Sequence, residues 1–199
     1  FGMGNYKDSK LENLADKGNG NYAYIDTMQE ARKVLGTEFG GTLYTIAKDV
    51  KIQVEFNPAL VQGYRLIGYE NRMLNAEDFQ DDTKDAGEIG SGHTVTALYE
   101  VVPTGVKTPF LKPVDDLKYS TTIPSGEADA NELMQVKVRY KKPDGDHSML
   151  VEQPVPNTFK AMENASADFN FMAGVALFGM QLRDSPFSNG ADRTVTLNL

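Results

Sequence analysis

The densest group of side chains that could do chemistry is a run of six acidic residues between positions 77 and 88, followed by a glycine-rich turn and a histidine. Closely spaced carboxylates are typical of sites for hard cations such as Ca²⁺. The EF-hand spacing is absent, because counting from Asp81 puts Ala86 at position six and Gly92 at position twelve. A cation site therefore competes with a solvated acidic loop that uses Asp and Gly for its turns. The candidate ligands are Asp78, Asp81, Asp82, Asp85 and Glu88.

The other polar residues favour no catalytic site. A Ser-His-Asp arrangement would need His93 or His147 beside an activated serine, and the Gly-x-Ser-x-Gly pattern is absent. The chain has no cysteine, which excludes thiol catalysis, disulfides and Cys/His zinc sites. We expect no catalytic residue and no enzyme activity, and we interpret a basic stripe on one predicted strand as a solvated face. The stripe consists of Lys137, Arg139, Lys141 and Lys142.

Charge and composition restrict the class of partner. The 199 residues include 20 Lys and Arg against 28 Asp and Glu, a net charge of −8. Nucleic acids and anionic membranes are bound by clustered positive charge, so neither is expected as a partner. A hydrophobic content of 40% with 24% charged residues is typical of a folded globular chain. The longest apolar run, Phe171–Met180, is about half of what a membrane span requires.

The first 41 residues have the pattern of helix, strand and helix. Residues 8–17 place leucines on one helical face, and Tyr22–Ile25 is a short apolar run typical of a strand. Asp26 or Thr27 would cap a second helix, which is predicted to end at Gly40-Gly41. One strand cannot cover two helices, so this segment is expected to be the end of a larger α/β sheet.

After residue 42 the apolar residues alternate with polar ones, the pattern of strands. Val50, Ile52, Val54 and Phe56 are predicted to face inward, with Lys51 and its neighbours outward. The turn at 142–146 should join two strands into a hairpin. We expect an antiparallel sandwich or barrel. The predicted strands are 50–56, 64–69, 93–102, 134–140 and 148–153, with a short one near Lys118–Thr122.

The last predicted element is a helix that Ser166 caps and that ends at Asp184-Ser185-Pro186. Its apolar residues form a wide face that we expect to pack against the sheet. The tail from Arg193 to Leu199 alternates again, as an edge strand would. The most regular stripe of the helix consists of Phe171, Val175, Phe178 and Leu182.

Several stretches together resemble a family of bacterial exported proteins with a von Willebrand factor type A domain. Gly2–Ala15 and Gly18–Asp26 resemble the closing segment of that domain. Three further stretches resemble the uncharacterised domain that follows the type A domain: Arg65–Arg72, Glu77–Gly90 and Gly92–Glu100. Residues nearer the C-terminus resemble the terminal helix of that uncharacterised domain: Phe178–Met180, Leu182-Arg183 and Ser185.

The resemblance implies an α+β chain with two parts. Residues 1–41 would be the α/β remnant of the Rossmann-like type A domain, and 42–199 an antiparallel β-sandwich-like domain with a C-terminal helix. The metal-ion-dependent adhesion site of type A domains begins with Asp-x-Ser-x-Ser. The nearest match, Asp146–Leu150, lacks the second serine, so Mg²⁺ is expected only upstream and no metal ligand or cofactor is assigned here.

The resemblance also implies a function outside the cytoplasm. We expect a non-enzymatic protein-interaction or scaffolding module, periplasmic or at the cell surface, anchored to the membrane through an upstream segment, with an unknown protein partner. The alternative is a cation- or glycan-binding β-sandwich that uses loop 77–93. If residues 1–41 lack their sheet partners, Tyr22–Ile25 would offer an open edge through which the chain forms a homodimer.

Overall fold

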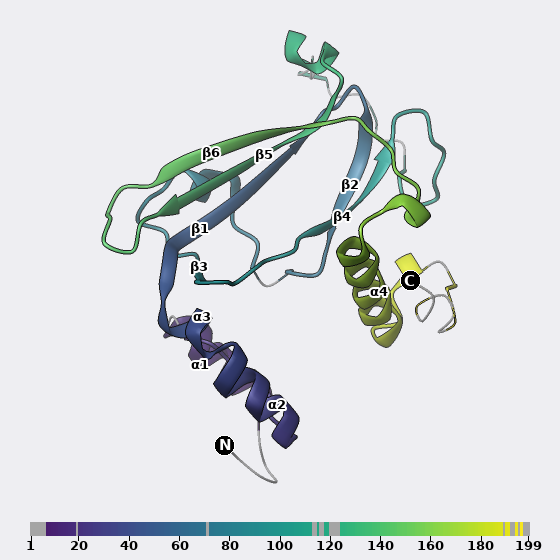
Figure 1. The fold of residues 1–199 in the computed structure, drawn as a ribbon. Helices are drawn as coiled ribbons and strands as arrows, with labels where there is room; N and C mark the ends of the chain where they lie inside the picture. Colours follow the sequence, from purple (N-terminus) through teal and green to yellow (C-terminus); the bar gives the residue numbers. More distant parts are fainter. Residues whose placement is uncertain are drawn as a thin grey trace. The chain divides into compact units, whose positions relative to one another are not determined.

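The chain is mixed α+β, with antiparallel sheets and a C-terminal helix (Figure 1). This computed structural model describes residues 7–18, 20–70, 72–112, 115, 118–119, 124–188, 190–191, 194 and 196. The helices are α1 (Asp8–Lys17), α2 (Met28–Arg32), α3 (Phe39–Leu43) and α4 (Ala167–Leu182). The strands are β1 (Thr45–Phe56), β2 (Val61–Ile67), β3 (Gly87–Gly90), β4 (Leu98–Pro103), β5 (Glu132–Lys141) and β6 (Met149–Pro156).

The strands form two sheets, one with the order β3-β1-β5-β6 and one made of β2 and β4. The chain divides into two compact units. Unit 1 comprises Phe1–Lys51, Asp81–Thr94 and Arg139–Met149, and unit 2 comprises Ile52–Gln80, Val95–Val138 and Leu150–Leu199. The sandwich packing and the boundary at residue 41 stay predictions.

The helices of unit 1 confirm part of the sequence pattern. The α1 helix covers the predicted residues, and the Thr27 side chain caps α2 by accepting a hydrogen bond of 3.1 Å from the Glu30 amide. The predicted strand Tyr22–Ile25 is wrong, because residues 20–26 are irregular and pair with no strand among the described residues.

The predicted helix end at Gly40-Gly41 is also wrong. The helix continues from α2 through a π-helical turn at Lys33–Thr37, and α3 then includes both glycines. Gly41 lies against the backbone of β3: a Cβ on Gly90 would be only 1.4 Å from the Gly41 carbonyl oxygen. These glycines therefore allow two backbones to approach closely, which has little to do with ending a helix.

Strand β1 contains a bulge just before its predicted alternating residues. The pairs Ala47↔Ile89 and Val50↔Gly87 leave one extra residue on β1, and Asp49 there has a φ of 52°. The alternation predicted from Val50 onward is confirmed only in part. Phe56 is buried as predicted, whereas Lys51 is 2% exposed and Ile52 is 47% exposed, the opposite of the sides predicted for them.

In unit 2, β2 and β4 form an antiparallel ribbon whose register pairs Arg65 with Glu100 and Leu66 with Tyr99. The predicted strand from His93 begins only at Leu98, and the predicted strand at 64–69 begins earlier, at Val61. Phe56 is buried against this ribbon, with ring centroids 4.5 Å from Tyr64 and 5.4 Å from Tyr99.

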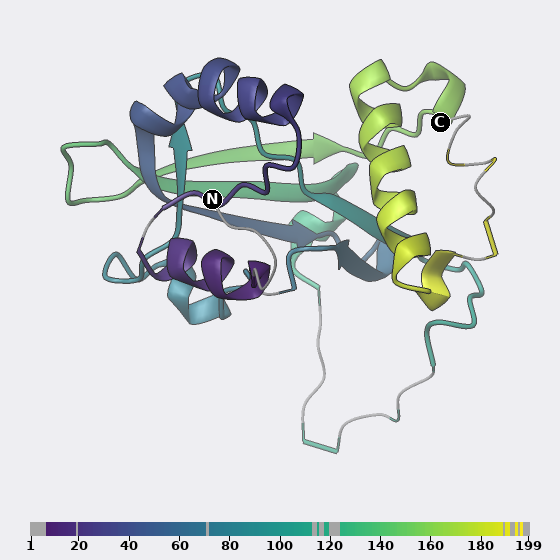
Figure 2. The ribbon, with the colours of Figure 1, turned by 90° about the horizontal axis from the view of Figure 1, so that it is seen from below.

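The α4 helix begins as predicted, because the Ser166 side chain accepts a hydrogen bond of 3.2 Å from the Phe169 amide. The turn Pro186–Ser188 folds back beside its end (Figure 2). The buried residues of α4 are Gly174 and Met180. The predicted burial of the most regular apolar stripe is wrong: Phe171, Val175, Phe178 and Leu182 are 65, 52, 50 and 68% exposed.

Some predictions concern residues that the structure does not describe. The Gly2-Met3-Gly4 segment lies outside the described residues, as do most of the short strand near Lys118–Thr122 and most of the tail strand from Arg193. Within the described ranges, no helix combines the length and the apolarity needed to cross a membrane.

Candidate functional site

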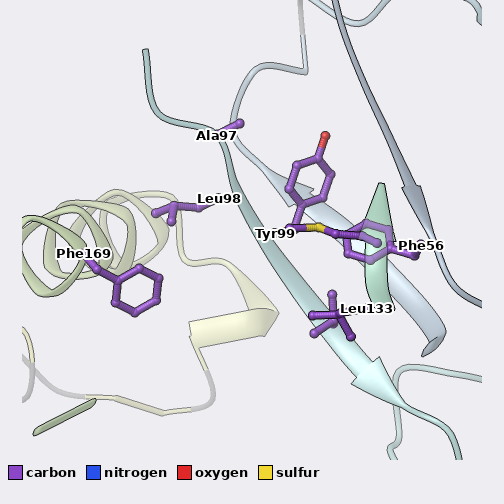
Figure 3. A pocket seen from close by; sticks show the side chains of 8 residues that line it. Phe56, Ala97, Leu98, Tyr99, Leu133 and Phe169 are labelled. Carbon is purple, nitrogen blue, oxygen red and sulfur yellow. The ribbon is translucent and has the colours of Figure 1, made fainter. Parts of the chain in front are cut away.

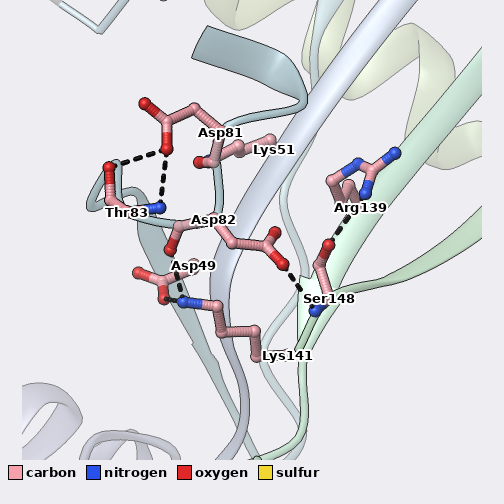
Figure 4. Close-up of polar contacts among 8 residues, drawn as sticks. All are labelled: Asp49, Lys51, Asp81, Asp82, Thr83, Arg139, Lys141 and Ser148. Carbon is pink, nitrogen blue, oxygen red and sulfur yellow. Dashed lines mark hydrogen bonds and ion pairs between the residues drawn. The ribbon is translucent and has the colours of Figure 1, made fainter. Parts of the chain in front are cut away.

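Two of the predicted acidic ligands, Asp81 and Asp82, lie in unit 1 with their carboxylates already engaged (Figure 4). The Asp81 carboxylate accepts hydrogen bonds of 2.8 Å from the Thr83 amide and 2.7 Å from its hydroxyl. The Asp82 carboxylate accepts one of 3.2 Å from the Ser148 amide through Oδ2, while its Oδ1 is buried and makes no hydrogen bond to the described residues. Both acids therefore shape the loop in which they lie, as Asp residues do in turns.

Two lysines hold the same loop from the strands. Lys51, on β1, donates a hydrogen bond to the Asp81 backbone carbonyl. Lys141, at the end of β5 and 9% exposed, donates bonds of 2.8 Å to the Asp49 carboxylate and 2.7 Å to the Asp82 carbonyl (Figure 4). A buried ammonium requires such partners. The positive charges that contact this loop are therefore the ammonium groups of Lys51 and Lys141.

The ionisation of the cluster follows from these contacts. Burial acts to raise the pKa of Asp49, but the hydrogen bond and positive charge of Lys141 outweigh it and bring that pKa below its ordinary value. The hydrogen bond to Asp49 raises the pKa of Lys141. Hydrogen bonds from Ser148 lower the pKa of Asp82. All three groups are therefore charged at neutral pH.

The remaining predicted ligands do not gather around the lysines as a set. Asp78 belongs to unit 2, where it accepts a bond of 3.1 Å from the Asn75 side chain. Glu88 is exposed on β3, and Asp85 is exposed in the loop before it. In the described part of the chain, no three acidic or histidine side chains form a group that could hold a metal. A cation site on this loop stays a prediction.

The basic stripe on β5 differs from the predicted solvated face. Lys141 is buried in the ion pair, which the sequence pattern did not indicate. Lys137 lies 3.7 Å from Glu55 and 3.8 Å from Glu152, and Arg139 donates a bond of 2.9 Å to the Ser148 hydroxyl. The strand therefore directs its basic residues to partners within the chain.

A second candidate site lies in unit 2, where the sequence indicated none. It is an apolar groove of about 220 Å³ (Figure 3), and Tyr99 is the only lining residue with a polar side-chain atom. Burial raises the pKa of the Tyr99 hydroxyl, with a smaller contribution from Tyr64. The groove residues are Phe56, Ala97, Leu98, Tyr99, Val101, Leu133, Met134 and Phe169.

The groove follows one strand lengthwise. Ala97 precedes β4, and Leu98, Tyr99 and Val101 belong to it, so one short stretch of chain supplies half of the lining. The lining comes from four separate elements, so no local pattern predicts it; the signal available was the stretch from Ala97 to Val102, which is apolar except for Glu100. The groove can take up apolar side chains and offers no acid–base pair.

Comparison with known proteins places the chain in a family without an assigned activity. Residues 41–199 match the family described as "Uncharacterized protein YfbK, C-terminal". The uncharacterised protein YfbK of Escherichia coli (strain K12) is 45% identical over 192 residues, which cover 95% of this chain and 32% of that protein. The chain thus spans about a third of the length of this curated relative. No solved structure matches.

Proposed function

We propose that this chain, which belongs to the YfbK C-terminal family, is a non-enzymatic module that binds an extended apolar segment of another protein. The observation that carries the proposal is the groove along β4, with its apolar lining and its single polar hydroxyl at Tyr99. Peptide-binding sites of this kind take side chains into apolar hollows while the backbone of the ligand runs beside a strand.

The neighbouring backbone supports this mode of binding. The ribbon of β2 and β4 has two strands, so in the described part of the chain each of them has one edge without a neighbouring strand. A partner segment could add to the β4 edge through main-chain hydrogen bonds and place alternate side chains in the groove. Specificity would then come from residue size, because the lining offers no charge.

We also propose that residues 1–41 are the end of a von Willebrand factor type A domain, in a larger protein that acts outside the cytoplasm. In support, the family match begins at residue 41 and the relative is about three times as long. Leu14, Met28 and Leu35, on the N-terminal helices, are 67, 71 and 52% exposed, as expected of helices that pack against further elements. Self-pairing through Tyr22–Ile25 loses its basis, because that segment is not a strand.

Peptide selection tests the binding proposal. A library of random dodecapeptides is selected against the 199-residue chain, and the selected peptides are measured for affinity. Ala97→Trp would fill the groove and should weaken binding at least tenfold, whereas Ala59→Trp, at an exposed turn, should leave it unchanged. A failure to select any peptide, or peptides that bind the Ala97→Trp variant as tightly as the parent chain, would contradict the proposal.

A fusion experiment tests the location. The natural full-length protein is made with a C-terminal reporter enzyme that folds only when its disulfides form, which requires an oxidising compartment. We expect an active reporter. An inactive reporter on a stable fusion would place the domain in the cytoplasm and contradict the extracytoplasmic part of the proposal.

A further inference from the structure

A second hollow of unit 2 lies next to the apolar groove and has an acidic lining. Its volume is about 350 Å³, within the range of about 300–1,000 Å³ that is usual for ligand sites. The groove and this hollow share Phe56 and Met134, so they are neighbours. We call the hollow the acidic pocket; its polar residues are Glu55, Asn57, Ser125, Glu127, Glu132 and Gln135.

The negative charge of the acidic pocket is only partly compensated within the chain. Glu55 lies 3.7 Å from the Lys137 ammonium, whereas Glu127 and Glu132 are exposed and form no ion pair among the described residues. In the same part of the chain, no Lys, Arg or His lines the pocket. The pocket therefore carries a net negative charge that attracts a cation.

The segment that carries Glu127 and Glu132 is fixed to the end of β1 by Asn57. The side-chain amide of Asn57 donates hydrogen bonds of 3.0 Å to the Ala128 carbonyl, 3.4 Å to the Ala130 carbonyl and 3.0 Å to the Glu132 carbonyl. These bonds hold the backbone of both acidic residues in place before any ligand binds. A preformed site has less ordering to pay for when its ligand arrives.

The arrangement of the carboxylates suits an organic cation better than a metal ion. A metal ion takes several oxygen ligands at about 2.0–2.6 Å, and no three acidic or histidine side chains of the described residues converge in this way. The ammonium of Lys or the guanidinium of Arg can instead interact with carboxylates spread around a hollow. The methylene groups of such a side chain would contact Phe56 and Met134.

We propose that the protein segment bound in the groove carries a lysine or arginine whose side chain enters the acidic pocket. This inference rests on the peptide-binding function proposed above and specifies its partner. An extended segment advances about 3.3 Å per residue, so in neighbouring hollows the basic residue should lie within about four residues of the apolar side chains in the groove. The net charge of −8 adds to the attraction and favours basic partners over acidic ones.

The selected dodecapeptides test this inference, and they should be enriched in Lys or Arg at that spacing. The double variant Glu127→Gln/Glu132→Gln should bind such a peptide about tenfold more weakly than the parent chain does. It should bind the same peptide with its basic residue replaced by Gln as tightly as the parent chain, which also shows that the variant is folded. The control double variant Glu12→Gln/Glu77→Gln removes two exposed charges outside both hollows and should bind like the parent chain.

The outcomes of this experiment separate the acidic pocket from the groove. Peptides that Ala97→Trp weakens, but that lack basic residues or bind Glu127→Gln/Glu132→Gln like the parent chain, would overturn the acidic pocket and leave the groove supported. An equal loss of affinity in the control double variant would mean that the overall charge attracts the peptide, and it would overturn the acidic pocket as well.

A small probe tests the acidic pocket even if the selection yields no peptide. The 199-residue chain is titrated with N-acetylarginine methylamide, and amide chemical shifts are followed by NMR. The amides of residues 125–135 should shift with this probe and not with its glutamine analogue. The shifts should disappear in Glu127→Gln/Glu132→Gln and persist in the control double variant. No shift in the parent chain, or equal shifts with both probes, would overturn the inference.

Discussion

The close approach of α3 and β3 makes Gly90 a sharp test of the fold. A Cβ at position 90 would lie 1.4 Å from the carbonyl oxygen of Gly41 and 2.5 Å from its carbonyl carbon. Both atoms belong to the backbone, so no side-chain rotation can relieve the clash. We predict that Gly90→Ala forces the end of β3 away from α3.

The size of the effect follows from the geometry. A carbon and a carbonyl oxygen without a bond are rarely closer than about 3.3 Å, so the two backbones must separate by about 2 Å. That shift breaks the hydrogen bond of 2.8 Å from the Ser91 amide to the Tyr44 carbonyl and disturbs the pairing of Gly90 with Thr45. At about 1 kcal/mol for each lost bond plus the strain that remains, we expect a loss of about 3 kcal/mol.

Urea unfolding of the variant measures this loss, and hydrogen exchange of the amides at 41–47 locates it. The matched control is Gly87→Ala in the same strand, where a Cβ would meet only the Val50 carbonyl oxygen at 3.9 Å. This control should cost less than about 1 kcal/mol, because an ordinary contact replaces open space. Equal losses for the two variants, or unchanged exchange at 41–47 in Gly90→Ala, would refute the reasoning.

Three further predictions concern polar contacts. Because the pKa of Asp49 is lowered and that of Lys141 is raised, their pair stabilises the fold between about pH 4 and pH 10 and weakens as the pH leaves that window on either side. Asp49→Asn should therefore reduce the loss of unfolding free energy on acidification, measured by urea unfolding; an unchanged acid profile would argue against the pair. Arg65→Lys should cost about 1 kcal/mol by urea unfolding, because the guanidinium lies 3.9 Å from the Phe187 ring centroid; a neutral substitution would contradict this. Millimolar Ca²⁺ should leave the melting temperature unchanged, because the carboxylates of Asp81 and Asp82 accept hydrogen bonds from Thr83 and Ser148. A rise of several degrees would support the cation site instead.

Features that depend on a few adjacent residues could be predicted from the sequence. The pattern predicts a cap at Asp26 or Thr27 and one at Ser166, because a side-chain oxygen followed by a helical run has one favourable use, and the structure shows the caps at Thr27 and Ser166. The hairpin between β5 and β6 followed from the Pro-Asp-Gly turn at 143–145 in the same way. In each case the interaction is complete within a few residues, so no distant partner decides it.

Features that need a distant partner could not be predicted. Lys51 is one of the polar residues of an alternating pattern and is nevertheless buried, because its ammonium donates a hydrogen bond to the carbonyl of Asp81, thirty residues away. The acids at 81 and 82 belong to a closely spaced acidic run, and the structure shows lysines of β1 and β5 beside them. A sequence displays the carboxylates together but does not display which ammonium groups the fold will bring to them.

The α4 helix shows the same limit for apolar surface. Its sequence is apolar on nearly every side, which correctly indicates that most of its surface is meant to be covered. It does not say which face the unit covers, and the most regular stripe was the natural choice. The structure buries Gly174 and Met180 instead, which lie outside that stripe. The steps of four, three and four residues along the stripe are those of any amphipathic helix, so its regularity does not select the face that packs.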